Sequence, residues 1–118
     1  MMEQDKIELY HSFKPTRFPV LDRLELRQNT VNSRGGVALN IELTLRSDDE
    51  NDQNRLTLLF VGVRDLQFEP KIQPIQFGFI QVVSIHDYQW QDVHYKVVES
   101  EQDVKFSLLC DDITVTLK

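Results

Sequence analysis

The sequence predicts an all-β fold, a single-domain antiparallel β-sandwich of about seven or eight strands, and two patterns carry this prediction. Apolar residues alternate with polar ones through residues 37–46, which places five apolar side chains on one face of a strand. Apolar segments then recur along the chain, and turn-forming residues separate them about every eight to twelve residues, as in a sandwich or a barrel. An open β-barrel is the alternative fold.

The N-terminal segment, residues 1–19, is expected to be loosely attached to the single domain formed by residues 1–118. Pro15 and Pro19 are too closely spaced for a helix or a central strand there. Residues 5–13 are predicted to form a short helix or an edge strand. The apolar side chains available to pack against the sheet are Ile7, Leu9 and Tyr10.

The remaining elements are all predicted to be strands. Gly62 interrupts an apolar run, and it predicts a bulge, a bend or a close backbone approach there. The loop of residues 47–54 contains turn-forming residues and four carboxylates, so we expect it to be exposed. The predicted strands are residues 20–31, 36–46, 55–61 continuing through 63–68, 75–85, 93–98, 104–109 and 113–117. The residues expected to be buried are Leu39, Ile41, Leu43, Leu58, Phe60 and Phe106.

Composition and charge restrict the class of protein. The 118 residues are 41% hydrophobic and 27% charged, which fits one globular domain and excludes a disordered chain. The single cysteine excludes an intrachain disulfide. The N-terminus has acids where a signal peptide needs basic and then apolar residues, so a cytoplasmic location is expected.

The net charge of −6 is unevenly distributed along the chain. Residues 1–46 carry seven Lys or Arg against six acids, whereas residues 47–118 carry six against thirteen. One end or face is therefore expected to be negative, which would repel nucleic acid and membranes and attract a basic protein partner. Solubility alone is the simpler explanation of this charge.

No catalytic signature is present, so we do not expect an enzyme. The serines lack the glycine-flanked turn that exposes a nucleophile, and Cys110 ends an apolar strand, where a half-buried small side chain is expected. Asp111 and Asp112 are adjacent on a strand, so their carboxylates should point to opposite faces. His86 and His94 lack the spacing of a zinc site. No metal or organic cofactor is expected, unless distant strands bring His86, His94 and Asp111 together.

A group of aromatic and histidine side chains is the candidate binding site. Tyrosine and tryptophan often anchor interfaces, because they bury a large area at a low entropic cost. The same residues also close one end of many β-cores, and this is the simpler interpretation. The candidate binding residues are His86, Tyr88, Trp90, His94 and Tyr95.

Three segments carry a resemblance to known proteins: residues 56–66 (LTLLFVGVRDL), 85–90 (IHDYQW) and 95–97 (YKV). With these segments the chain resembles small uncharacterised bacterial all-β proteins, some of which are similar to immunity proteins of bacterial toxin systems. The resemblance covers the second half of the chain, and it implies a bacterial cytosolic binding protein. It implies no active-site residue.

Two functions are therefore compared. The first is a non-enzymatic protein-interaction module, of immunity type, which binds and blocks a partner. The second is a small-molecule or carbohydrate carrier with an aromatic-lined pocket. We also expect weak homo-oligomerisation through a sheet edge or an aromatic patch. The residues that would line the carrier's pocket are Phe77, Phe79, Tyr88 and Trp90.

Overall fold

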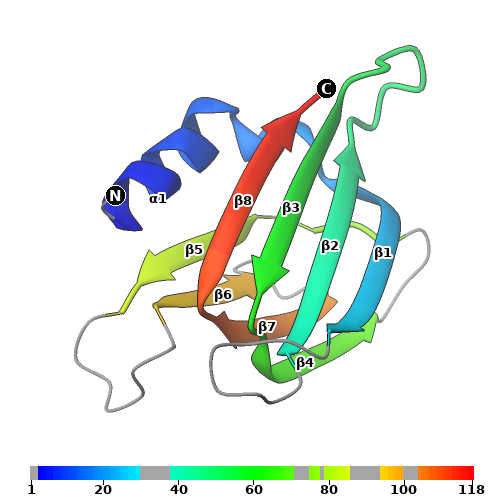
Figure 1. Ribbon diagram of the computed structural model, residues 1–118. Helices are drawn as coiled ribbons and strands as arrows, with labels where there is room; N and C mark the ends of the chain where they lie inside the picture. The colour runs from blue at the N-terminus through cyan, green and yellow to red at the C-terminus, as the bar shows by residue number, and fades with distance from the viewer. Residues whose placement is uncertain (1–2, 30–37, 71–74, 78, 86–93, 100–103) are drawn as a thin grey trace.

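A computed structural model describes residues 3–29, 38–70, 75–77, 79–85, 94–99 and 104–118, and within them eight strands form two antiparallel four-stranded sheets. The strand order is β1-β2-β3-β8 in one sheet and β4-β7-β6-β5 in the other, and the strands of the second run across those of the first (Figure 1). The fold is thus the predicted sandwich and not a closed barrel. The elements are α1 (Glu3–Ser12), η1 (Pro15–Arg17), β1 (Val20–Asn29), β2 (Ala38–Arg46), β3 (Arg55–Val61), β4 (Arg64–Pro70), β5 (Ile80–Ser84), β6 (Tyr95–Glu99), β7 (Val104–Cys110) and β8 (Asp112–Leu117).

The core forms between the sheets because alternate residues of each strand are apolar and face inward. Strand register aligns them across the sheet, so that Ile41 lies opposite Phe60 and Phe60 opposite Ile113. Five of the six residues expected in the core are buried: Ile41, Leu43, Leu58, Phe60 and Phe106. Leu39 is only partly buried. The strand β3 pairs with β2 from Ile41 to Arg46, so Leu39 lies beyond the paired part.

Gly62 is the point at which the chain leaves one sheet and enters the other. It has a φ of 70°, which is a left-handed conformation that glycine adopts without strain. The sequence predicts one strand that continues from 55–61 into 63–68. Instead, β3 and β4 belong to different sheets, and a bend at Gly62, one of the three features expected there, separates them.

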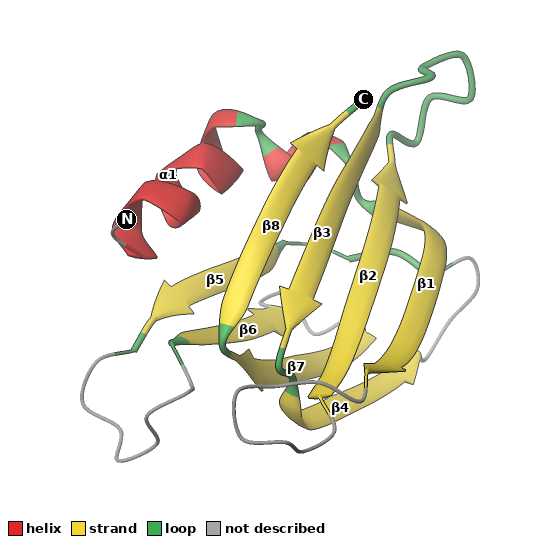
Figure 2. Cartoon of the chain, viewed as in Figure 1, coloured by secondary structure: helices red, strands yellow, loops and turns green. Residues whose placement is uncertain are grey.

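The N-terminal segment is more firmly attached than expected. Of the two structures predicted for it, the helix is correct, and α1 contacts both β5 and β8 at the open side of the sandwich (Figure 2). Ile7 and Tyr10 are buried, whereas Leu9 is 46% exposed. The Tyr10 hydroxyl donates a hydrogen bond of 2.5 Å to the Ile80 carbonyl oxygen.

The predicted strand 75–85 divides into two parts that pair with different sheets. Gln76 forms an isolated bridge with Val20 of β1, whereas β5 begins only at Ile80 and pairs with β6. The described loop 47–54 is largely exposed, as predicted, and Asp49 and Asp52 each accept a hydrogen bond from a backbone N–H two residues later. Within the described residues, no helix is both long and apolar enough to cross a membrane.

Candidate functional site

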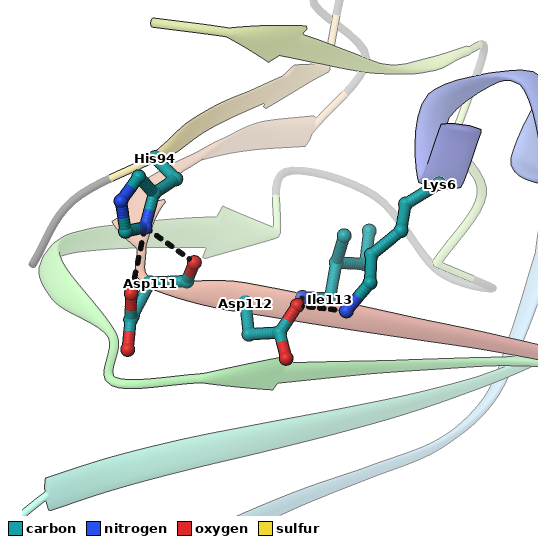
Figure 3. A network of polar contacts seen from close by, with 5 residues as sticks. All are labelled: Lys6, His94, Asp111, Asp112 and Ile113. Atoms are coloured by element: carbon teal, nitrogen blue, oxygen red, sulfur yellow. Dashed lines mark hydrogen bonds and ion pairs between the residues drawn. The ribbon is translucent and has the colours of Figure 1, made fainter. Parts of the chain in front are cut away.

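Four polar side chains gather where β7 passes into β8 and β6 begins, and we call this group the polar corner: Lys6, His94, Asp111 and Asp112 (Figure 3). Backbone hydrogen bonds hold the corner from two sides. The His94 N–H donates to the Cys110 carbonyl oxygen at 2.9 Å, and the Asp111 N–H donates to the Val61 carbonyl oxygen at 2.9 Å. The corner is therefore fixed to strands of both sheets.

His94 and Asp111 form one half of the polar corner. The His94 Nδ1 lies 2.7 Å from the Asp111 Oδ1 and 3.0 Å from the Asp111 carbonyl oxygen. A nitrogen between two acceptors must carry the proton, so Nδ1 is the donor. The side chains are 40% and 44% exposed, which leaves both accessible to a protein partner.

Lys6 and Asp112 form the other half. The Lys6 Nζ is paired with the Asp112 Oδ1, and the same oxygen accepts the Ile113 N–H at 2.9 Å. Figure 3 shows Asp111 turned towards His94 and Asp112 towards Lys6. These neighbouring carboxylates diverge as predicted, although Asp111 lies in the bend between β7 and β8 and only Asp112 is on a strand.

Gly62 lies directly against Asp111. A Cβ added at Gly62 would lie 3.0 Å from the Asp111 Cβ, closer than real Cβ atoms normally approach a neighbour. A larger residue would therefore displace either the bend or Asp111. The glycine between β3 and β4 thus supports the His94–Asp111 pair.

Cys110 lies beneath the polar corner and is fully buried. Burial raises the pKa of its thiol to about 12, and the nearby Asp112 and Asp111 carboxylates act in the same direction. The thiol is therefore protonated at neutral pH, which is unsuited to a nucleophile. Within the described part of the chain, no three His, Cys, Asp or Glu side chains gather as a metal site would require.

The predicted binding residues lie in different environments or outside the described part of the chain. His86, Tyr88 and Trp90 lie outside the described residues. The His94 side chain is 40% exposed, and folding brings its ring within hydrogen-bond distance of Asp111. Tyr95 is 2% exposed and belongs to the core, so it offers no surface for binding.

The residues proposed to line a carrier's pocket are also divided. Phe77 is 2% exposed, and its ring packs edge-on against Phe106 with centroids 5.5 Å apart. Phe79 instead stacks with His11 at 6.1 Å. Phe77 is therefore a core residue, and its packing gives no support to a pocket.

Sequence reasoning did not find the role of Lys6. It lies 106 positions from Asp112, and no local pattern connects the two. Two groups of the described acidic residues can be placed on the first sheet. The 47–54 loop precedes β3, and Asp111 and Asp112 lie where β3 ends, so these two acidic groups occupy opposite ends of the sheet (Figure 1).

A scan against protein-family models matches residues 2–116 to the family described as immunity protein PIM8. The chain belongs to this family. The match confirms the immunity-protein resemblance, and it extends over nearly the whole chain, including the N-terminal helix. No curated protein and no solved structure matches the chain.

Proposed function

We propose that this protein binds a bacterial toxin and blocks it, acting by binding and not by catalysis, in the bacterial cytoplasm. The observation that carries the proposal is the family match over residues 2–116. The protonated Cys110 thiol and the diverging Asp111 and Asp112 carboxylates agree with a binding role.

We further propose that the polar corner is part of the toxin-binding surface. His94, Asp111 and Asp112 are 40%, 44% and 47% exposed, and their backbone is held by the strands. A preorganised surface loses little entropy on binding. Two carboxylates against the single Lys6 ammonium leave the corner with a charge of −1 when His94 is neutral, which suits a basic patch on the toxin.

The test first looks for a toxin-like reading frame beside this chain's gene. Its product is purified as an inactive variant for binding and expressed in active form for the growth assay. We expect a stoichiometric complex by calorimetry and restored growth when both proteins are expressed in one bacterium. A neighbouring toxin that neither binds the purified chain nor is neutralised by it would contradict the proposal.

The contribution of the corner is tested by a pair of matched double variants. Asp111→Asn with Asp112→Asn should weaken toxin binding by about tenfold, mainly through slower association, because long-range attraction to the basic patch is lost. Asp48→Asn with Asp49→Asn removes the same charge from the opposite end of the sheet and should change binding much less. Equal effects would assign the role to net charge and not to the corner. Thermal melts check that both variants are folded.

A further inference from the structure

Among the strands that the structure describes, three of the four at sheet edges have features that hinder pairing with another chain. An exposed edge carries unpaired backbone N–H and C=O groups and invites a further strand. The edges at β5 and β8 are contacted by α1, with Tyr10 bonded to the Ile80 carbonyl oxygen and Lys6 to Asp112. The edge strand β4 has a register shift after Arg64 and ends at Pro70, which lacks an N–H.

The fourth edge strand, β1, is the longest in its sheet. Within the described residues, the segment 75–77 pairs with it only at Pro19–Leu21. Beyond the bulge at Asp22, its register with β2 is unbroken from Arg23 to Asn29, and no described strand pairs with its other side. This part of β1 is therefore a regular edge without a described neighbour.

The side chains of β1 make this edge unusual in two ways. Leu26 is 53% exposed, more than any other large apolar side chain in the described residues, although its partner Ile41 is buried. On the other face, Glu25 accepts hydrogen bonds from both Arg27 and Arg23. These bonds, with Arg27 contributing most, lower the pKa of Glu25, so the carboxylate stays charged.

We propose that this protein forms a homodimer in which β1 pairs antiparallel with β1 of a second copy, with Leu26 opposite its own equivalent. In an antiparallel pair the residue numbers of facing residues have a constant sum, which is 52 when Leu26 faces Leu26. This register therefore places Glu25 opposite Arg27 of the second copy and Arg27 opposite Glu25. The exposed Leu26 then meets an identical apolar side chain, and two opposite-charge pairs flank it. The two sheets become one continuous sheet across a two-fold axis.

The neighbouring registers are less favourable. Centring the pair on Glu25 places two carboxylates opposite one another and Arg23 opposite Arg27, which brings like charges together. Centring it on Leu24 restores an Arg23–Glu25 pair but places Leu26 opposite the charged Asp22, and the bulge disrupts pairing there. Charge and hydrophobic complementarity together therefore select the register centred on Leu26.

The first experiment measures the mass of the protein by sedimentation velocity over about a hundredfold range of concentration. The unmodified chain should shift from monomer to dimer. Leu26→Glu should raise the dissociation constant by about tenfold or more, because it places two carboxylates at the two-fold axis. Leu117→Glu is the matched control, because Leu117 is 41% exposed and lies on β8, away from β1. This variant should dimerise as the unmodified chain does.

The second experiment tests the register. Glu25→Arg alone would place arginines opposite one another, and Arg27→Glu alone would place glutamates opposite one another, so each variant should be monomeric at concentrations where the unmodified chain dimerises. An equal mixture should form a heterodimer, because an arginine of one variant then faces a glutamate of the other in both pairs. Circular dichroism melts establish that each variant is folded.

Three results would overturn the homodimer. They are a monomer at every concentration, equal loss of dimer in Leu26→Glu and Leu117→Glu, and a mixture of charge variants that stays monomeric. If the protein is monomeric and Leu26→Glu abolishes toxin binding, the edge belongs to the toxin and not to a second copy.

Discussion

Replacement of Tyr10 tests whether the N-terminal helix is an integral part of the fold. Tyr10 is fully buried, and α1 contacts an edge strand from each sheet. Sequence alone favoured a loosely attached segment, which would contribute little to stability. The burial of Tyr10 predicts a large contribution instead. The two predictions differ by several kcal/mol in the free energy of unfolding lost when Tyr10 is replaced.

The size of the effect follows from the burial of the side chain. A buried tyrosine removes about 150–250 Å² from water, and at about 25 cal/mol per Å² this gives an upper estimate of about 4–6 kcal/mol. Large aromatic to alanine changes in cores cost about 3–5 kcal/mol. We therefore expect Tyr10→Ala to lower the free energy of unfolding by about 3–5 kcal/mol. Tyr10→Phe should cost about 1–2 kcal/mol, because only the bond to the Ile80 carbonyl oxygen is lost.

The assay is urea unfolding followed by circular dichroism, with the slope m compared between variants to check that the transition remains two-state. Leu9→Ala on the same helix is the matched control, because Leu9 is 46% exposed, and its effect should stay within about 0.5 kcal/mol. A Tyr10→Ala protein as stable as the unmodified chain, or a Leu9→Ala protein equally destabilised, would refute the reasoning.

The same residue predicts a dependence on pH. Burial raises the pKa of the Tyr10 phenol above its ordinary value of 10.0, so above that pH the folded state retains a proton that the unfolded state loses. The stability due to the neutral phenol is therefore complete below about pH 10 and decreases as the pH rises above it. Tyr10→Phe should unfold with a weaker dependence on pH in this range. An unchanged alkaline dependence would show that Tyr10 does not cause it.

Three further predictions concern the core and the bend. Phe60→Ala should cost about 3–5 kcal/mol in urea unfolding, and an unchanged midpoint would remove Phe60 from the core. Gly62→Ala should cost about 1–3 kcal/mol, because it adds strain at positive φ and a contact with Asp111, and the signal of the His94 ring in NMR should move with it. Cys110 should react with a thiol reagent only as fast as the protein unfolds, and rapid labelling of the folded protein at pH 8 would contradict its burial and raised pKa.

The sequence determined most strand positions of this protein and most of its core. Alternation of apolar and polar residues has a period of two only in a strand, so the inward positions of β2 and β3 were readable without a structure. Turn residues and glycine marked the ends of strands in the same local way. The resemblance to immunity proteins likewise depended on local residues, and the family match then extended it to residues 2–116.

Only the tertiary structure decided which strands share a sheet and which distant residues meet. An irregularity at Gly62, in the form of a bulge, a bend or a close backbone approach, was predicted. The passage from one sheet to the other was not, because a strand pattern looks the same in either sheet. The attachment of Tyr10 and the pairing of Lys6 with Asp112 depend on where α1 packs. His94 and Asp111 meet because adjacent strands bring them together, and a separation of 17 residues carries no local signal of contact. Local patterns fix conformation, whereas contacts between distant residues depend on how whole elements pack.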